Sequence, residues 1–493
     1  MGRLLVLFSF AAGSVAAMAA ADSAPFVFHL DFNVSALNRD AIVRTLDHVA
    51  RQGCNAILWE IENAVKFDCC PEVASPDAFT KDEFRGILAH AAKLGLEPIP
   101  LMQTFGHGEY VLAHDRFKPL RERPDRKDCY CSSNPEARKF LKTLLHEYLD
   151  LFGAGVRRFH LGGDEAWVYR SCAKCKARKP AELYFEHLEA VSAELRAKGV
   201  RPGVWHDMLR RFDETGAVYA DLPKDFAIWY WDYGTFENGA WARGHEAALR
   251  RERANGREVI YCGSIRSFID SPFFVRYGFH RANLAESISW CRKEKLSGYC
   301  VTSWAIHQGP LELQRPLIDF AAKRWLDPGV DADADWRGIV ARHFGVGVTA
   351  EDLDALTDWN MGLFGADARF GTYKDGALPP PGGIAGRVAK WGAGEAEKTA
   401  AVVRALSEKA AKPAAALRRA RAANASPFVG LALEAAELKI AYQNMMADAL
   451  SGTNDAAAAF PRERALRFYR RELGERSAWR CVERICRLYE GEK

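Results

Sequence analysis

The sequence predicts an α/β protein, a (β/α)₈ barrel followed by a mainly helical C-terminal domain. Short β-branched and aromatic runs recur eight times between residues 26 and 326, and helical stretches of 3.6-residue periodicity lie between them. Eight such units in about 300 residues match the size of a barrel. A doubly wound open sheet would alternate in the same way, but no G-x-G-x-x-G follows the first run.

The eight predicted strands are bounded by turn residues. In chain order they are Phe26 to Phe32, Asn55 to Ile61, Glu97 to Gln103, Val156 to Gly163, Arg201 to Asp207, Phe226 to Asp232, Glu258 to Gly263 and Gly298 to Trp304. The helices predicted between them include Lys81 to Leu94, Pro135 to Phe152, Ala181 to Lys198 and Leu284 to Lys295. Because catalytic side chains of such barrels lie at the C-terminal strand ends, the site is expected there.

The chain changes character after the last predicted strand. Gly and Pro punctuate residues 376–383, and Ala-, Arg- and Glu-rich stretches follow at 385–450 and 462–489. We expect a signal peptide at residues 1–21, a catalytic barrel at 22–330 and a helical domain at 331–493. No cluster of site-like residues interrupts the periodicity of this last part, which favours packing over substrate binding.

The net charge and the N-terminal segment limit the kinds of partner that we expect this protein to bind. A net charge of +4 in 493 residues, with basic and acidic residues interspersed, indicates neither a nucleic-acid surface nor a membrane surface and suits a neutral glycan. The apolar run from Leu4 to Ala17, followed by small residues, predicts cleavage, a secreted or periplasmic protein and no stable membrane insertion afterwards. An uncleaved anchor is the alternative.

Six of the twelve cysteines fall between predicted elements. They follow three neighbouring strands, so we expect them to meet on one face of the barrel: Cys69, Cys70, Cys129, Cys131, Cys172 and Cys175. Disulfides, a structural zinc site and free thiols all remain open, because an isolated C-x-x-C is a weak zinc signal.

The end of the fourth strand carries the main chemical signal. Gly162 and Gly163 leave room for a ligand beside the backbone, and Asp164 and Glu165 follow where the strand turns into its loop. Adjacent strand residues face opposite ways, so both carboxylates serve one ligand only if the chain twists there. An Asp-Glu pair is usually a solvated loop, but this position and the nearby Trp167 favour a functional site.

This segment resembles glycoside hydrolase family 20, the β-N-acetylhexosaminidases, whose hallmark is a His-x-Gly-Gly-Asp-Glu run. Further segments look like successive strand ends of the hexosaminidase D branch: LWEIENAVKFD from Leu58, QTFGHGEY from Gln103, WHDML from Trp205, WDY from Trp231 and TSW from Thr302. The resemblance covers the barrel and not the tail, and it implies an exo-acting enzyme that removes terminal β-linked GlcNAc or GalNAc.

The resemblance also implies a retaining mechanism in which the 2-acetamido oxygen of the substrate is the nucleophile. Asp164 would then orient the acetamido group, and Glu165 would protonate the leaving oxygen and later activate water, which calls for a raised pKa of Glu165. The residues agree, since an ordinary retaining enzyme places a second carboxylate across the barrel. The seventh strand ends Tyr261-Cys262-Gly263-Ser264-Ile265-Arg266, without one.

Substrate-binding candidates stand at the other strand ends. Aromatic faces suit the C–H faces of a pyranose, so Trp231 and Trp304 are expected in the pocket, with Trp304 as its floor and part of the tryptophan set in the core. Tyr233 is expected to donate its hydroxyl to the acetamido oxygen, with Tyr230 as a competitor. The remaining candidates are His107, which would hold a carboxylate by analogy with the family, and Glu109, Glu60 and Asp31.

One departure from the family pattern and two alternative functions remain. The family usually has a basic residue after the first strand, whereas this chain reads Leu30-Asp31-Phe32-Asn33, so Asp31, Asn33 or Arg266 would have to bind the outer hydroxyls. A non-catalytic glycan-binding barrel is the alternative function. A metal-dependent hydrolase finds little support because no H-x-H or H-E-x-x-H occurs, and we expect neither a catalytic metal nor a cofactor.

Overall fold

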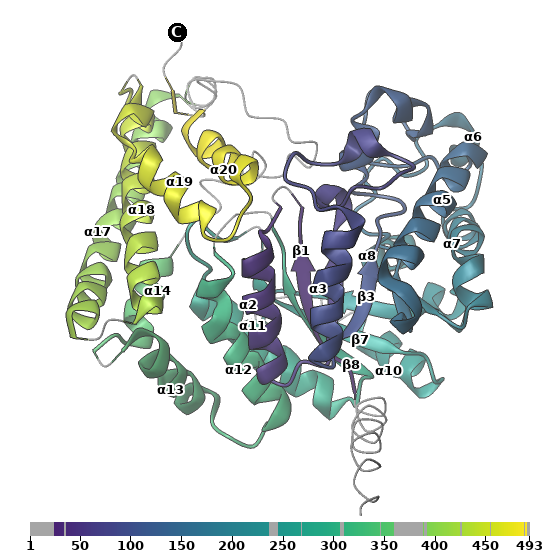
Figure 1. Ribbon diagram of the computed structural model, residues 1–493, viewed down its shortest axis with the longest axis horizontal. Coiled ribbons are helices and arrows are strands. Elements are labelled where there is room, and N and C mark those ends of the chain that lie inside the picture. Colours follow the sequence, from purple (N-terminus) through teal and green to yellow (C-terminus); the bar gives the residue numbers. More distant parts are fainter. Residues whose placement is uncertain are drawn as a thin grey trace, which may run out of the picture.

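Eight parallel strands form a closed barrel in the order β1 to β8, which confirms the predicted fold class (Figure 1). The computed structural model describes residues 24–33, 36–235, 245–267, 269–305, 310–345, 347–358, 388, 392–423, 426–453, 455–487 and 489–490. The strands are β1 Phe26–Asp31, β2 Ala56–Glu60, β3 Glu97–Leu101, β4 Arg158–His160, β5 Arg201–Trp205, β6 Ala227–Trp231, β7 Val259–Arg266 and β8 Gly298–Ser303. Seven of these lie within the predicted runs, and β7 begins one residue later and continues three residues further.

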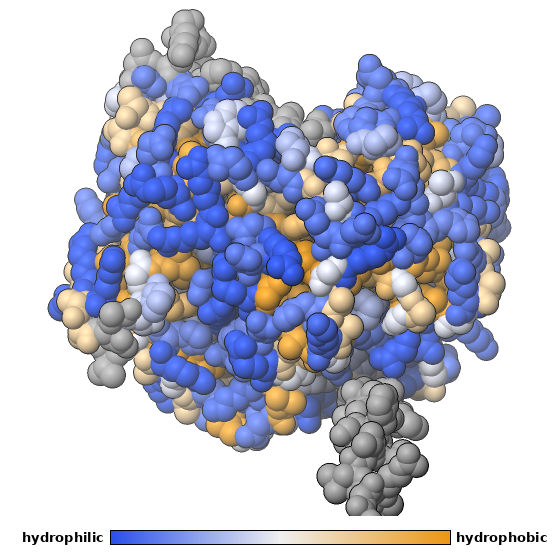
Figure 2. Space-filling view, viewed as in Figure 1, coloured by the Kyte–Doolittle hydropathy of each residue, from blue (hydrophilic) through white to orange (hydrophobic). Residues whose placement is uncertain are grey.

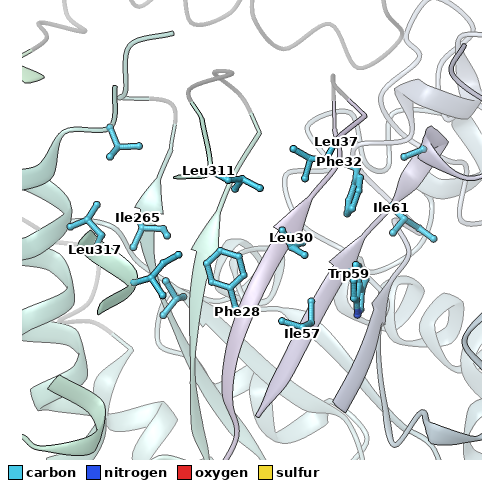
Figure 3. Close-up of a cluster of buried hydrophobic side chains, with 14 of the residues drawn as sticks. Phe28, Leu30, Phe32, Leu37, Ile57, Trp59, Ile61, Ile265, Leu311 and Leu317 are labelled. Carbon is cyan, nitrogen blue, oxygen red and sulfur yellow. The ribbon is translucent and has the colours of Figure 1, made fainter. Parts of the chain in front are cut away.

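Strand alternation separates two apolar layers. Along β1, Phe28 and Leu30 point toward the surrounding helices, as do Ile57 and Trp59 of β2 (Figure 3). Val27 belongs instead to a smaller cluster that fills the barrel together with residues of the other strands, which are Ala56, Leu58, Ile99, Leu101, Trp205, Ala227, Trp229, Ile260, Cys262 and Cys300. The interior is therefore packed with side chains, and a ligand has room only beyond the strand ends.

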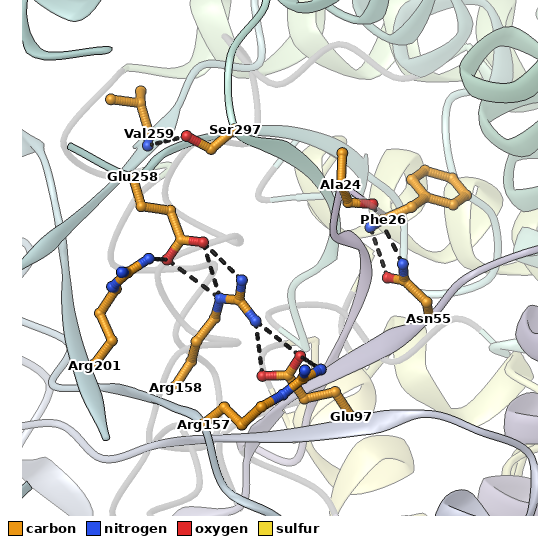
Figure 4. Close-up of polar contacts among 10 residues, drawn as sticks. All are labelled: Ala24, Phe26, Asn55, Glu97, Arg157, Arg158, Arg201, Glu258, Val259 and Ser297. Carbon is orange, nitrogen blue, oxygen red and sulfur yellow. Dashed lines mark hydrogen bonds and ion pairs between the residues drawn. The ribbon is translucent and has the colours of Figure 1, made fainter. Parts of the chain in front are cut away.

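An ion network lies at the N-terminal end of the barrel. The Arg158 guanidinium donates to Glu97 at 2.8 and 2.9 Å and to Glu258 at 2.7 and 3.0 Å, and both carboxylates are buried (Figure 4). Arg157 adds a bond of 2.6 Å to Glu97. Paired charges of this kind fix β3, β4 and β7 relative to one another. They occupy the N-terminal end of the barrel, opposite the end where the active site is expected.

Helices surround the barrel between the strands. They are α2 Arg39–Arg51, α3 Lys81–Lys93, α5 Pro135–Phe152, α7 Pro180–Ala197, α10 Glu246–Ala254, α11 Tyr277–Lys293 and α12 Arg315–Leu326. Thr80 and Glu83 form a capping box at the start of α3, and Asn134 caps α5 ahead of Pro135. These signals explain why α3 and α5 begin at the predicted residues.

The C-terminal region is helical and packs on the barrel. Its helices are α13 Ala332–Phe344, α14 Ala350–Thr357, α17 Ala393–Ala423, α18 Pro427–Leu450, α19 Arg462–Arg470 and α20 Glu475–Arg487. Leu473, between α19 and α20, pairs with Leu37 in the loop after β1. The Glu472 carboxylate accepts backbone bonds from Leu311 and Glu312, in the loop after β8, so the tail supports two strand-end loops.

Two sequence predictions fall outside the described residues: the signal peptide at 1–21 and the Gly- and Pro-punctuated segment at 376–383. In the part of the chain that is described, no helix has the length and apolar character needed to cross a membrane.

Figure 2 shows a notch in the molecular outline between the lobe that holds α17 to α20 and the lobe that holds α5 and α7.

Candidate active site

Asp164 and Glu165 lie where β4 ends, and the backbone turns sharply between them. Glu165 has φ +43°, in the left-handed region that costs a non-glycine residue on the order of 1 kcal/mol or more. Asp164 is 4% exposed, whereas the Glu165 side chain is 37% exposed. The turn supplies the twist that two adjacent carboxylates need in order to serve one ligand.

His107 joins the two carboxylates. Its Nε2 lies 3.3 Å from Asp164 Oδ2 and 3.5 Å from Glu165 Oε2. His107 is itself at φ +54°, and it precedes the short helix α4 (Glu109–Leu112) in the loop after β3. The structure therefore places His107 beside the pair, as the sequence analysis expected, in a position to hold both carboxylates.

Asp207, at the end of β5, is a site residue to which the sequence analysis gave no role. Its Oδ2 accepts a hydrogen bond of 2.9 Å from the backbone N–H of Glu165. Burial, and after it the charge of Asp164, raises the pKa of Asp207 to about 8. The WHDML segment contained this residue, but only the distance to Glu165 shows that it supports the pair.

Three aromatic side chains, Trp231, Tyr233 and Trp304, lie at the C-terminal ends of β6 and β8. Trp231 and Trp304 are partly exposed and pack on the cluster inside the barrel. Trp231 stacks on Tyr233 with ring centroids 5.4 Å apart, and Trp304 Nε1 donates to the Tyr233 hydroxyl at 2.6 Å. Trp229, in contrast, is 1% exposed and belongs to the core. This division agrees with the expectation that part of the tryptophan set is core.

The two candidate tyrosines point to different places. Tyr230 is buried among the outer-layer residues, with its ring centroid 4.0 Å from His206 and 5.4 Å from Tyr261. Burial raises the pKa of Tyr233 well above its usual value, and the charge of Asp164 adds to the effect. Tyr233 thus keeps its proton; its hydroxyl interacts with the Thr302 side chain and accepts from the Trp304 indole N–H, so its O–H remains able to act as a donor.

Asp31 and Glu60 occupy more enclosed positions than the other substrate-binding candidates. Asp31 accepts backbone bonds of 2.7 Å from Asn33 and from Ala305, which link the loops after β1 and β8. Glu60 is 0% exposed, and its oxygens lie 3.1 Å from His29 Nε2 and 2.9 Å from Gln103 Nε2. Direct substrate contact by either side chain stays a prediction.

Arg266 lies at the end of β7, beside the same loops. Its Nε donates to the backbone oxygen of Trp304 at 2.6 Å. Among the charged groups near it, Asp31 has the largest electrostatic effect on the guanidinium. Burial nevertheless lowers the pKa of the Arg266 guanidinium from its usual value. The guanidinium is therefore placed under the rim of the site, next to Trp304.

Several buried polar atoms at or just after the C-terminal strand ends have no hydrogen-bond partner among the described residues. They are Asp164 Oδ1, Asp207 Oδ1, Glu109 Oε2, Asn33 Oδ1 and Trp231 Nε1. Buried polar atoms are nearly always paired, and each unpaired one costs about 1–3 kcal/mol. Carboxyl and amide oxygens together with one indole N–H at the strand ends indicate a ligand that carries hydroxyl and amide groups.

The end of β7 offers no carboxylate to face Glu165 across the barrel. Residues 259–267 contain neither Asp nor Glu. Asp270, the next carboxylate along the chain, is 0% exposed and is bound by His280 Nε2 at 2.9 Å and by the backbone N–H groups of Ser267 and Arg276. Asp270 therefore has a structural role and is not placed as a nucleophile.

Comparison with known proteins agrees with this geometry. Residues 60–271, which run from the last residue of β2 to just beyond β7, match the model of the glycosyl hydrolase family 20 catalytic domain. Hexosaminidase D of Bos taurus is 30% identical over 191 residues, which cover 37% of this chain and 55% of that protein. Hexosaminidase D of Homo sapiens is 31% identical over 193 residues, which cover 37% and 39%.

The chain thus spans about half or less of the length of the curated relatives it matches. Among solved structures, a β-N-acetylhexosaminidase from Bacteroides fragilis aligns with a TM-score of 0.49 and 17% identity over 65% of this chain and 70% of that chain. The family match covers β4 with Asp164 and Glu165, the loop after β3 with His107, and β5 with Asp207. The part of the chain that carries these residues is therefore similar to the glycosyl hydrolase family 20 catalytic domain.

Proposed function

We propose that this protein is an exo-acting β-N-acetylhexosaminidase that hydrolyses terminal β-linked GlcNAc or GalNAc, with the acetamido oxygen of the substrate as nucleophile. The observation that carries the proposal is the pairing of Asp164 with Glu165 at His107 Nε2, 3.3 and 3.5 Å away, with no carboxylate at the end of β7. A retaining enzyme with its own nucleophile needs two carboxyl groups about 5–5.5 Å apart on opposite sides of the bond.

In the first step the acetamido oxygen attacks the anomeric carbon and the glycosidic C–O bond breaks. Glu165, the more exposed of the pair, gives its proton to the departing oxygen. Asp164 accepts a hydrogen bond from the acetamido N–H and offsets the positive charge on the oxazolinium ring. Tyr233 donates its hydroxyl to the acetamido oxygen and orients it for attack.

In the second step Glu165, now a carboxylate, removes a proton from water, and the water oxygen attacks the same carbon. The ring opens, the acetamido group is restored and the sugar leaves with its original configuration. His107 keeps Asp164 and Glu165 in place through both steps. Asp164, Glu165, His107 and Tyr233 are the only side chains that these two steps require.

Trp167 supports a binding role on the leaving-group side. It follows Glu165 by two residues, is 59% exposed and has the Arg211 guanidinium 5.4 Å from its ring centroid. An exposed aromatic face next to the acid suits stacking against the sugar that departs. Trp167→Ala is expected to raise KM for N-acetylhexosamine oligosaccharides and to leave KM for small aryl glycosides unchanged.

A panel of chromogenic β-glycosides tests the proposed activity, with Glu165→Gln assayed in parallel to exclude a contaminating enzyme. Turnover of β-GlcNAc or β-GalNAc substrates by the wild-type chain, reduced in the variant, is the expected result. The alternative function, a glycan-binding barrel without turnover, predicts that the wild-type chain binds these sugars in a calorimetric titration and hydrolyses none of them.

A further inference from the structure

Three cysteines and one glutamate converge beside the active site. Cys131 belongs to the segment after β3. In the segment after β4, Cys172 caps the short helix α6 (Ala173–Lys176), and Cys175 lies within that helix. Cys131 Sγ lies 3.8 Å from Cys172 Sγ and 3.6 Å from Cys175 Sγ. The three sulfurs and a carboxylate oxygen of Glu122 all lie within 4.8 Å of one another.

The spacing of the sulfurs fits a tetrahedral ion better than a disulfide. A disulfide joins two sulfurs at about 2.05 Å and would leave the third thiol without a role. A zinc–sulfur bond of about 2.3 Å in tetrahedral geometry places two sulfurs about 3.8 Å apart. Both sulfur–sulfur distances from Cys131 agree with that tetrahedral edge to within a few tenths of an ångström.

Glu122 supplies an independent indication of a missing fourth interaction. The residue is 2% exposed, and its Oε1 accepts a bond of 2.9 Å from the backbone N–H of Cys172. Its Oε2 is buried and has no N–H or O–H donor within reach among the described residues. A carboxylate oxygen buried beside three thiols is unfavourable on its own and is stabilised by a cation.

We propose that Cys131, Cys172, Cys175 and Glu122 bind one zinc ion as a closed, structural site. The three thiols release their protons to solvent on binding, and all four tetrahedral positions are then filled by the protein. Four anionic ligands around Zn²⁺ leave a net charge of −2. Arg170, whose guanidinium donates to the backbone oxygens of Cys175 and Lys176, partly offsets that charge.

The ion would tie together the two loops that hold the catalytic pair. The Cys131 segment is bound to the His107 segment through the backbone bonds from Tyr130 N to Phe105 O and from Gly108 N to Asp128 O. The α6 segment continues the loop that begins at Asp164 and Glu165. Zinc therefore fixes the distance between His107 and the two carboxylates without taking part in the reaction.

Elemental analysis of the full chain, purified without added metal or chelator, tests the proposal directly. We expect close to one zinc per chain in the wild type and in Cys69→Ser, a half-buried thiol of the loop after β2 that serves as the matched control. Cys131→Ser and Cys175→Ser are each expected to lose most of the zinc. Stripping the wild type with a chelator should lower Tm by several degrees, and zinc should restore it.

A second measurement keeps the proposal testable if the serine variants do not fold. Cobalt(II) exchanged into the wild-type chain should show intense thiolate-to-cobalt charge-transfer absorption. Wild-type protein that contains no zinc and has an intact mass lower by two hydrogens would mean a disulfide and would overturn the site. Three freely titrating thiols in native, metal-free protein would overturn it equally. None of these readouts depends on glycosidase activity, so the proposed function can fail separately.

Discussion

The carboxyl group of Asp207 accepts a hydrogen bond from the backbone N–H of Glu165 at 2.9 Å, so the end of β5 holds Glu165, the proposed general acid, in place through the main chain. Glu165 has φ +43°, a conformation that persists only where neighbouring groups fix it. The same carboxylate has its pKa raised to about 8 by burial and by the charge of Asp164. Asp207 therefore supports the catalytic pair in its neutral form.

Asp207→Asn should change how stability depends on pH. A carboxyl whose pKa is raised on folding contributes stability below its unfolded pKa of about 4, and that contribution is lost as pH rises to about 8. Between these values we expect the stability of the wild type to fall relative to the variant by on the order of a few kcal/mol, because each unit of pKa shift corresponds to about 1.4 kcal/mol. Thermal unfolding of both proteins at several pH values measures the difference, and parallel curves would refute it.

Glu165→Gln should separate two kinds of substrate. Oligosaccharides with poor leaving groups need protonation and should lose about 10²-fold or more in kcat, whereas activated aryl glycosides should retain much more activity. Binding should change little because the amide keeps the shape of the carboxyl. Steady-state kinetics on both substrates measure the ratio, and equal losses would contradict the assignment of Glu165 as the acid.

Gly106→Ala should displace the catalytic pair. A Cβ at this position would lie 2.2 Å from the backbone oxygen of Asp164, so the loops after β3 and β4 would have to separate. We expect a loss of about 10²-fold in kcat, typical of a displacement near 1 Å. Gly86→Ala in α3 is the matched control, since its Cβ meets nothing within 4 Å and should stabilise the helix by about 0.5–1 kcal/mol. Activity of the Gly106 variant equal to that of the control would disprove the close contact.

Tyr233→Phe should slow the reaction more than Tyr230→Phe. Removing the Tyr233 hydroxyl takes away the donor to the acetamido oxygen and the acceptor of the Trp304 indole N–H. We expect kcat/KM on aryl β-GlcNAc to fall by about 10- to 100-fold, because one hydrogen bond that strengthens in the transition state is lost. Tyr230 lies in the outer layer, so its variant should keep kcat/KM near the wild-type value. The reverse order would move the donor role to Tyr230.

The barrel could be predicted because its signals are local and repeated. Each strand is a short apolar run, and helices such as α5 begin and end where their caps and glycines stand. The catalytic pair could be predicted from its position at a strand end and from the family resemblance. His107 was placed by that resemblance alone, and the structure adds its two distances to the pair.

The remaining features depend on contacts between distant segments. Asp207 lies 42 residues from Glu165, and nothing in its own surroundings distinguishes it from a solvated helix start. The enclosure of Glu60 follows from His29 on β1 and Gln103 just after β3, contacts between neighbouring strands that strand alternation does not reveal. Glu472 reaches the loop after β8 from 160 residues away, so the support from the tail needs the folded chain.

The central claim is that the substrate supplies the nucleophile, and its most direct test is kcat/KM on aryl β-GlcNAc substrates whose acetamido methyl group carries zero, one, two or three fluorine atoms. Fluorine withdraws electrons from the carbonyl oxygen, so kcat/KM should fall steeply along the series, and the plain β-glucoside should be cleaved very poorly. A flat series, with the β-glucoside turned over as fast as its N-acetyl counterpart, would contradict the account.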